Sequence, residues 1–149
     1  MHNWYKKVLF HRTITTYLRD IFYGRHRGSR VEHMIKISEK NSGSVTIIGI
    51  SGKIDSSSSP DVEKKINELI DRGNKYFVIN FAGAEYISSS GLRVMLSSLK
   101  KLRKVQGDLK LACLKPLVKD VFSTAGFTQI FELYDREEDA LSRFHMPGT

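Results

Sequence analysis

The segment KYFVINFAGAEYISSSGLRVMLSSLKKLRK, residues 75–104, decides the fold. Its first part, KYFVINFA, is apolar at nearly every position, which is typical of a β-strand that is covered on both faces. From Leu92 onward, leucine and methionine recur at helical spacing, so this part predicts an amphipathic helix. Three serines, Ser88 to Ser90, lie between strand and helix. They could act as a helix cap, a nucleophile or a phosphate acceptor.

The segments on either side of this unit alternate between strand and helix patterns. MIKIS and SVTIIGI are short β-branched runs joined by a turn at Asn41 and Gly43, so they predict a hairpin. The patterns that remain predict helices over 56–73, 115–125 and 135–144, and strands over 108–114 and 129–134. In the second of these helices we expect Leu117, Val118, Val121 and Phe122 to point inward. Strands that alternate with helices imply crossover connections, so the fold class is α/β. We expect one domain with a mainly parallel central sheet, an N-terminal β-hairpin, about five strands and four helices.

Charge divides the chain of 149 residues into two regions. Residues 1–33 contain seven basic and two acidic residues, and so hold +5 of the net charge of +8. This basic N-terminal extension is interpreted as disordered, as an amphipathic helix able to lie on a membrane, or as sequence upstream of a true start at Met34. Residues 34–149 form the predicted domain, which we expect to fold alone. Because the basicity is mostly N-terminal, no direct contact with nucleic acid is expected.

Several chemistries lack the residues that they need. The five histidines are His2, His11, His26, His33 and His145, so the predicted domain has no base for a serine triad before Phe144. Cys113 is the single cysteine, which excludes a zinc site built on Cys and His, and no phosphate-binding loop motif is present. We therefore expect no enzyme activity, no catalytic residue, no metal and no cofactor. The absence of a signal peptide and of a long apolar run predicts a cytoplasmic location.

The serine turn has physical properties that favour a phosphate. Serine is a preferred helix N-cap, but one cap explains one serine only. Gly91 lies in the first turn, where glycine is unfavourable unless the backbone approaches another group closely. The free N–H groups and the positive dipole end of a helix favour an anion at this position. Phosphorylation here would add about −1.5 to −2 charges to a surface of hydroxyl groups.

Three segments together resemble the STAS family, the bacterial anti-sigma factor antagonists and their relatives. YISSSGLRVMLSSLKKLRKVQGDLKLACL is similar to the family's Asp-Ser-Ser/Thr-Gly-Leu segment, which is followed by an amphipathic helix and a strand. GKIDSSSSPDV resembles its Gly-Glu-Leu/Ile-Asp segment and the helix start after it, and VKDVFSTAGFTQIFELY resembles its late helix, glycine turn and final strand. The three occur in the family's order and spacing across about residues 34–144.

The resemblance implies roles for particular residues. The family's phosphoacceptor falls on Ser89, with Ser90 as the second choice, while Ser88 occupies the position of the motif aspartate. Asp55 matches the aspartate of the earlier motif, in a loop that in the family lies beside the serine turn. The resemblance thus implies a partner-binding surface that consists of Gly52, Asp55, Ser56, Ser57, Ser58, Ser88, Ser90, Gly91, Leu92 and Arg93.

Two functions follow from this resemblance. In the first, the unphosphorylated protein binds a serine-kinase anti-sigma factor and frees a sigma factor; the kinase phosphorylates Ser89, and a metal-dependent serine phosphatase reverses the reaction. The protein would then be a partner-switching phosphoprotein of signal transduction and transcription regulation. In the second, the domain is a non-switching scaffold for a transporter or another signalling complex. Ser88 in place of aspartate and the basic extension both favour the scaffold.

Overall fold

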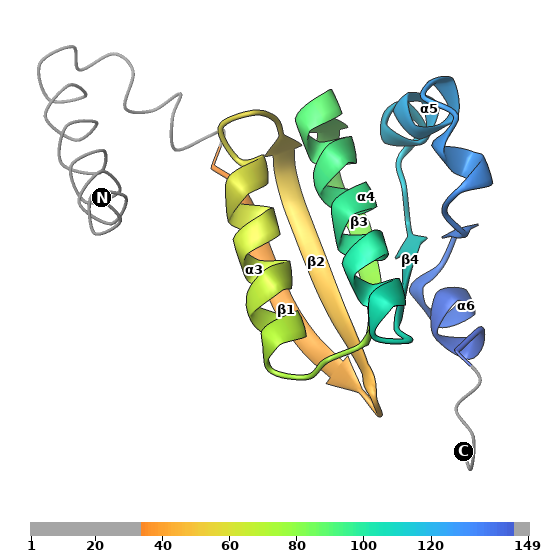
Figure 1. Ribbon diagram of the computed structural model, residues 1–149. Coiled ribbons are helices and arrows are strands. Elements are labelled where there is room, and N and C mark those ends of the chain that lie inside the picture. Colours follow the sequence, from red (N-terminus) through yellow and green to blue (C-terminus); the bar gives the residue numbers. More distant parts are fainter. Residues whose placement is uncertain (1–33, 145–149) are drawn as a thin grey trace, which may run out of the picture. The chain divides into compact units, whose positions relative to one another are not determined.

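The computed structural model describes residues 34–144, which form a central five-stranded sheet (Figure 1). The strands are adjacent in sequence order, β1-β2-β3-β4-β5. β1 and β2 pair antiparallel as a hairpin, and the other three pairs are parallel. The predicted α/β class with an N-terminal hairpin is therefore confirmed. The bounds are β1 Lys36–Ser42, β2 Val45–Ile54, β3 Tyr76–Ile87, β4 Asp108–Ala112 and β5 Leu133–Tyr134.

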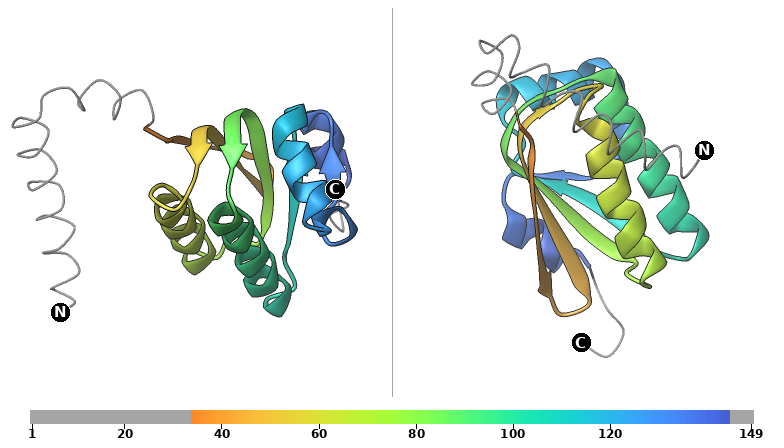
Figure 2. Two further views of the ribbon diagram at one scale, coloured as in Figure 1. Left: turned by 90° about the horizontal axis from the view of Figure 1, so that it is seen from above. Right: turned by 90° about the vertical axis from the view of Figure 1, so that its left-hand side faces the viewer.

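Four α-helices and a short 3-10 helix connect and cover the strands. Figure 2 shows α3 and α4 together on one face of the sheet and α6 on the other. Their starts follow the sequence signals: Pro60 lies in the first turn of α3, and three acidic residues open α6. The bounds are α3 Ser59–Asp71, α4 Ser89–Lys104, α5 Pro116–Thr124, η1 Phe127–Gln129 and α6 Glu137–Ser142.

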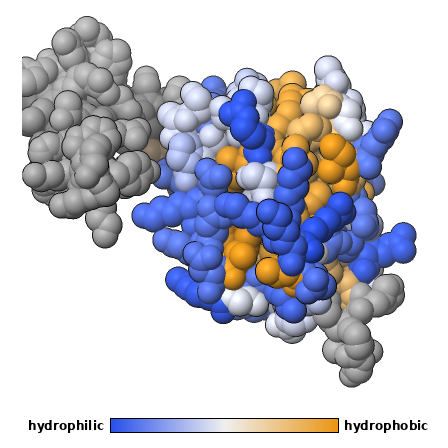
Figure 3. All heavy atoms as spheres, in the orientation of Figure 1, coloured by the Kyte–Doolittle hydropathy of each residue, from blue (hydrophilic) through white to orange (hydrophobic). Residues whose placement is uncertain are grey.

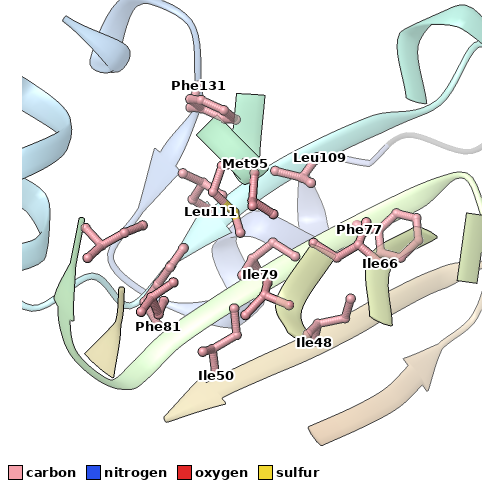
Figure 4. Close-up of a cluster of buried hydrophobic side chains, with 14 of the residues drawn as sticks. Ile48, Ile50, Ile66, Phe77, Ile79, Phe81, Met95, Leu109, Leu111 and Phe131 are labelled. Carbon is pink, nitrogen blue, oxygen red and sulfur yellow. The ribbon is translucent and has the colours of Figure 1, made fainter. Parts of the chain in front are cut away.

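The larger hydrophobic core lies between the sheet and the α3/α4 layer. Alternate residues of β2, β3 and β4 point into it, and α3 and α4 add the apolar stripes predicted from their sequences (Figure 4). β3 is central, as its continuous apolar run predicted, so its other face is also buried. There Val78 packs with Val45, Ile47, Ala112 and Ala140, and Ala140 belongs to α6.

A buried lysine links the central sheet to the C-terminal segment. Lys110 of β4 is only 5% exposed. Its Nζ lies 3.2 Å from Oδ2 of Asp108, 3.0 Å from Oε1 of Glu132 and 4.8 Å from the centre of the Phe144 ring. Two carboxylates and an aromatic face thus compensate the buried charge. The hydroxyl of Tyr134 donates a hydrogen bond to the same Glu132 oxygen, which completes a polar cluster at this edge.

Two local predictions were wrong. Leu117, expected to point inward, is 57% exposed, because the buried pair of α5 is Val118 and Phe122, one turn apart, and Leu117 lies 100° away around the helix. The last strand is shorter than expected. The N–H of Phe131 still donates to the carbonyl of Phe127, so the chain is turning there, and only Leu133–Tyr134 pairs with β4.

Further differences concern element ends. β1 continues through Asn41 to Ser42, so the hairpin turn consists of Gly43 and Ser44 only, and Gly43 has a φ of 61°. The expectations for residues 1–33 lie outside the described residues. Among the helices of residues 34–144, none is long and apolar enough to cross a membrane.

The two faces of α5 differ in their contribution to stability. Phe122 is fully buried and its ring packs edge-on against Phe81 and Phe131, so Phe122→Ala should lower the free energy of unfolding by about 3–5 kcal/mol. Leu117→Ala on the exposed face should change it by about 0.5 kcal/mol or less. Urea unfolding followed by circular dichroism measures both values. Similar losses for the two variants would contradict this assignment of the buried face.

Candidate functional site

Two loops lie side by side because the strands that precede them are parallel neighbours. β2 and β3 pair up to their last residues, Ile54 and Ile87. The chain direction is the same in both strands, so their loops leave from the same end of the sheet, at the N-termini of α3 and α4 (Figure 1). The N–H of Ser88 donates to the carbonyl of Ile54 at 2.8 Å, which joins the loops directly.

The serine turn contains one capping serine and one exposed serine. Ser88 is the N-cap of α4, with an extended backbone, and its Oγ accepts from the N–H of Gly91 at 3.4 Å. Ser89 is the first residue of the helix and is exposed, whereas Ser90 is half-buried. The hydroxyl of Ser88 is therefore used by the helix. Ser89 presents its hydroxyl to solvent at the positive end of the helix.

Gly91 is required by close packing beneath the turn. A Cβ atom at this position would lie 2.6 Å from Cγ1 of Ile87 and 2.8 Å from Cγ2 of Ile54. The first turn of α4 thus rests directly on the last residues of the two parallel strands. A glycine in the first turn of a helix predicted a close approach to another group, and the contact with Ile87 and Ile54 is that approach.

Asp55 organises the loop between β2 and α3. Its Oδ1 accepts hydrogen bonds from the N–H groups of Ser57 and Ser58, at 2.9 and 3.1 Å, and from the Ser57 hydroxyl at 2.7 Å. Partial burial opposes ionisation, but these hydrogen bonds outweigh it and lower the pKa of Asp55 below its ordinary value. The carboxylate is directed into its own loop, which it stabilises.

The other expected partner-binding residues divide into exposed and buried sets. Ser56, Ser57 and Arg93 are exposed, and Gly52 is half-buried with a φ of 103°. Leu92 and Ser58 are buried at 6% and 7% exposure, and the Ser58 hydroxyl donates to the carbonyl of Lys53 at 2.6 Å. The buried residues, with Gly91, shape the surface from below. The exposed ones lie on the loop between β2 and α3 and on the start of α4.

Two exposed apolar residues near this end of the domain were not predicted. Tyr86 is 41% exposed and lies two residues before Ser88, on the side of β3 opposite to the buried Ile87. The period-2 alternation of strands would have indicated this orientation. Leu117 is the second residue of α5, and Figure 3 shows that apolar surface, interrupted by polar side chains, is present on this face of the domain. Apolar side chains of this kind are typical of protein contacts.

Within residues 34–144 no three potential His, Cys, Asp or Glu ligands gather at one point. A depression lined by Ser38, Gly49, Asn80 and Glu137 lies on the face of the sheet that carries α6, away from the α4 side. The site is thus a surface of hydroxyl groups, one arginine and apolar residues around a helix N-terminus.

The chain is thus a five-stranded α/β domain that presents an exposed serine beside a second loop. The profile of the STAS domain matches residues 36–140, so the chain belongs to the STAS domain family.

Several similar proteins are named anti-sigma factor antagonists. BtrV of Bordetella bronchiseptica, assigned as an anti-sigma factor antagonist, is 34% identical over 74% of this chain and 95% of its own length. The anti-sigma F factor antagonist of Paenibacillus polymyxa is 26% identical over 75% of this chain and 97% of its own. The crystal structure of an anti-sigma factor antagonist from Mycobacterium paratuberculosis has a TM-score of 0.69, with 24% identity over 74% of this chain and 93% of that one.

Gly91→Ala tests the contact beneath the serine turn. Alanine favours a helix, but its Cβ would displace Ile87 or Ile54, so we expect the free energy of unfolding to fall by about 1–3 kcal/mol. In an Ile87→Ala background, which removes Cγ1, the same substitution should cost less. A double-mutant cycle by urea unfolding measures the difference. Strict additivity would show that the helix does not rest on Ile87.

The carboxylate of Asp55 should give the loop a pH-dependent stability. Its pKa is lower in the folded than in the unfolded state, so the contribution is complete above the unfolded value of about 3.9 and disappears as the pH falls through the folded value. Asp55→Asn should therefore destabilise the protein most above about pH 4, and the gap to wild type should narrow at lower pH. Urea midpoints from pH 7 to pH 3 measure this gap. A constant gap would contradict the assigned role of the charge.

Proposed function

We propose that this protein is an anti-sigma factor antagonist that works by partner switching. When unphosphorylated, it binds a serine-kinase anti-sigma factor and so releases a sigma factor. The kinase then phosphorylates Ser89, and a metal-dependent serine phosphatase removes the phosphate. The observation that supports this most strongly is the exposed Ser89 at the N-terminus of α4, beside the Asp55 loop, in a chain 34% identical to BtrV.

The physical basis of the proposed switch is charge added inside an interface. Ser89 stands among hydroxyl groups and one arginine, without an acidic residue in α4, and a phosphate would add about −1.5 to −2 charges there. A partner surface that fits the hydroxyl form would have to accommodate this charge and bulk without compensating groups. The fold tolerates a phosphate in at least one case, because SpoIIAA, with TM-scores of 0.65 and 0.60 to this chain, has structures in unphosphorylated and phosphorylated forms.

Ser88 bears on which hydroxyl is modified. A motif aspartate at this position would supply a negative charge next to the acceptor, whereas Ser88 uses its Oγ as an N-cap. Any activation of Ser89 must therefore come from the kinase. Ser90 remains the second choice, but it is less exposed than Ser89.

The remaining parts of the proposal concern partners and setting. The nucleotide would belong to the kinase and the metal to the phosphatase, so this chain would act as a binding module without a cofactor or catalysis of its own. It would control transcription through the anti-sigma factor, in the cytoplasm, without contacting nucleic acid itself. Membrane contact would require residues 1–33 to be translated and helical.

A second candidate is a scaffold that does not switch. Two observations favour it: the capping role of Ser88 in place of the motif aspartate, and the exposed Leu117 and Tyr86, which suit a permanent apolar contact. In that case Ser88 to Ser90 would serve as cap and turn only, and binding would not depend on charge at Ser89.

Substitutions at Ser89 separate the two candidates. Ser89→Asp should leave the unfolding midpoint nearly unchanged but weaken binding to the anti-sigma factor kinase, by about tenfold or more. Ser89→Ala should bind as tightly as wild type and stay bound in the presence of ATP. Isothermal titration calorimetry with the purified kinase measures the affinities, and Ser42→Asp, which adds the same charge at the exposed hairpin end of the sheet, is the control. Equal affinity for the Ser89→Asp and Ser89→Ala variants would support the scaffold.

A further inference from the structure

The side chain of Arg93 lies one helical turn after Ser89. Both residues belong to α4 and both are exposed. Residues four apart on a helix share a face, with Cβ atoms about 5–6 Å apart. Side chains of a helix also lean toward its N-terminus, so a long side chain at 93 extends over the turn that contains Ser89.

The guanidinium of Arg93 has no competing partner within the described part of the chain. The ion pairs of residues 34–144 involve other side chains, so no carboxylate oxygen lies within 4 Å of its nitrogens. The acid of the neighbouring loop, Asp55, accepts hydrogen bonds from Ser57 and Ser58. α4 contains no acidic residue along its whole length. An anion at Ser89 would therefore meet a free cation.

We propose that Arg93 binds the phosphate of phosphorylated Ser89 within the same chain. This rests on the proposed function, because it requires a phosphate at Ser89. Arginine suits the role since its planar fork can form two parallel hydrogen bonds to phosphate oxygens. The N–H groups of the first helical turn and the helix dipole would act on the same phosphate from the other side.

This pair would regulate the partner surface. In the unphosphorylated protein Arg93 is a positive charge next to the exposed serine, with no carboxylate partner among residues 34–144, and can meet an acidic group of the partner. Phosphorylation adds a dianion and at the same time withdraws this cation from the surface. One modification thus adds the negative charge of the phosphate to the interface and removes the positive charge of Arg93 from it.

The test uses the full chain with phosphoserine incorporated at position 89 during translation. Titration by ³¹P NMR at 0.1 M salt gives the second pKa of the phosphate, in wild type and in Arg93→Gln. We expect this pKa to be about 0.3 pH units lower with arginine present, because the pair stabilises the dianion. Arg93→Lys should keep part of the difference, and 0.5 M salt should reduce it.

Lys100→Gln is the matched control. It removes one positive charge from nearly the same face of α4, about 16 Å from Ser89 along the helix axis, which exceeds the screening length of about 10 Å at 0.1 M salt. It should leave the phosphate pKa unchanged. In the unsubstituted chain, the side-chain N–H resonance of Arg93 should also move when phosphoserine replaces serine. Equal phosphate pKa values with and without Arg93, together with an unmoved resonance, would overturn the proposal.

The design separates this pair from the proposed function. Because the phosphate is introduced during translation, the pair forms or fails to form regardless of whether any kinase modifies Ser89. A failure of the Ser89→Asp binding experiment would refute partner switching and leave the titration result intact. An unchanged titration would refute the pair and leave partner switching intact.

Discussion

The parallel pairing of β2 with β3 is the constraint on which the candidate site depends. It makes the two strands end together at Ile54 and Ile87, and the hydrogen bond from Ser88 N–H to the Ile54 carbonyl closes the junction. β2 and β3 also continue well past the point where β4 stops, since Ala112 pairs with Asn80. Bulges near Gly49 and Gly52 adjust the register along this extension. The loops are thus held by backbone pairing, and Ser56, Ser57 and Ser89 remain exposed on them and on the start of α4.

Much of this arrangement could be predicted from the sequence because the signals are local and strong. The apolar run of β3, the leucine spacing of α4 and the glycine in its first turn each have one simple structural explanation, and all three proved correct. The predictions failed where the outcome depends on neighbours. Leu117 and Val121 fit an apolar stripe as well as Val118 and Phe122 do, and only packing against Phe81 and Phe131 selects Phe122 as the buried anchor. The end strand was predicted too long because nothing in QIFELY shows that the preceding turn continues to Phe131.

In the candidate site, too, some features could be predicted from the sequence and others depend on the surrounding structure. Its position at the serine turn followed from the motif, but the separate roles of three identical residues did not. Ser88 caps the helix, Ser89 is exposed and Ser90 is half-buried, and these roles come from the direction in which the chain enters α4. Asp55 is a further case, because its residue type fits a partner contact, whereas its hydrogen bonds show that it holds its own loop together.

A phosphate at Ser89 would act with opposite sign on the fold and on an interface. At a helix N-terminus an anion stabilises the helix by about 0.3–1 kcal/mol, so a phosphate would not destabilise the folded domain. Burying the same charge against a partner without a compensating group costs several kcal/mol, because its hydration is lost. The larger magnitude belongs to the complex, so in the proposed switch a phosphate would change binding while the domain keeps its structure. The two effects can be separate because Ser89 is exposed, whereas Gly91, two residues later, packs against Ile87 and Ile54 of the core.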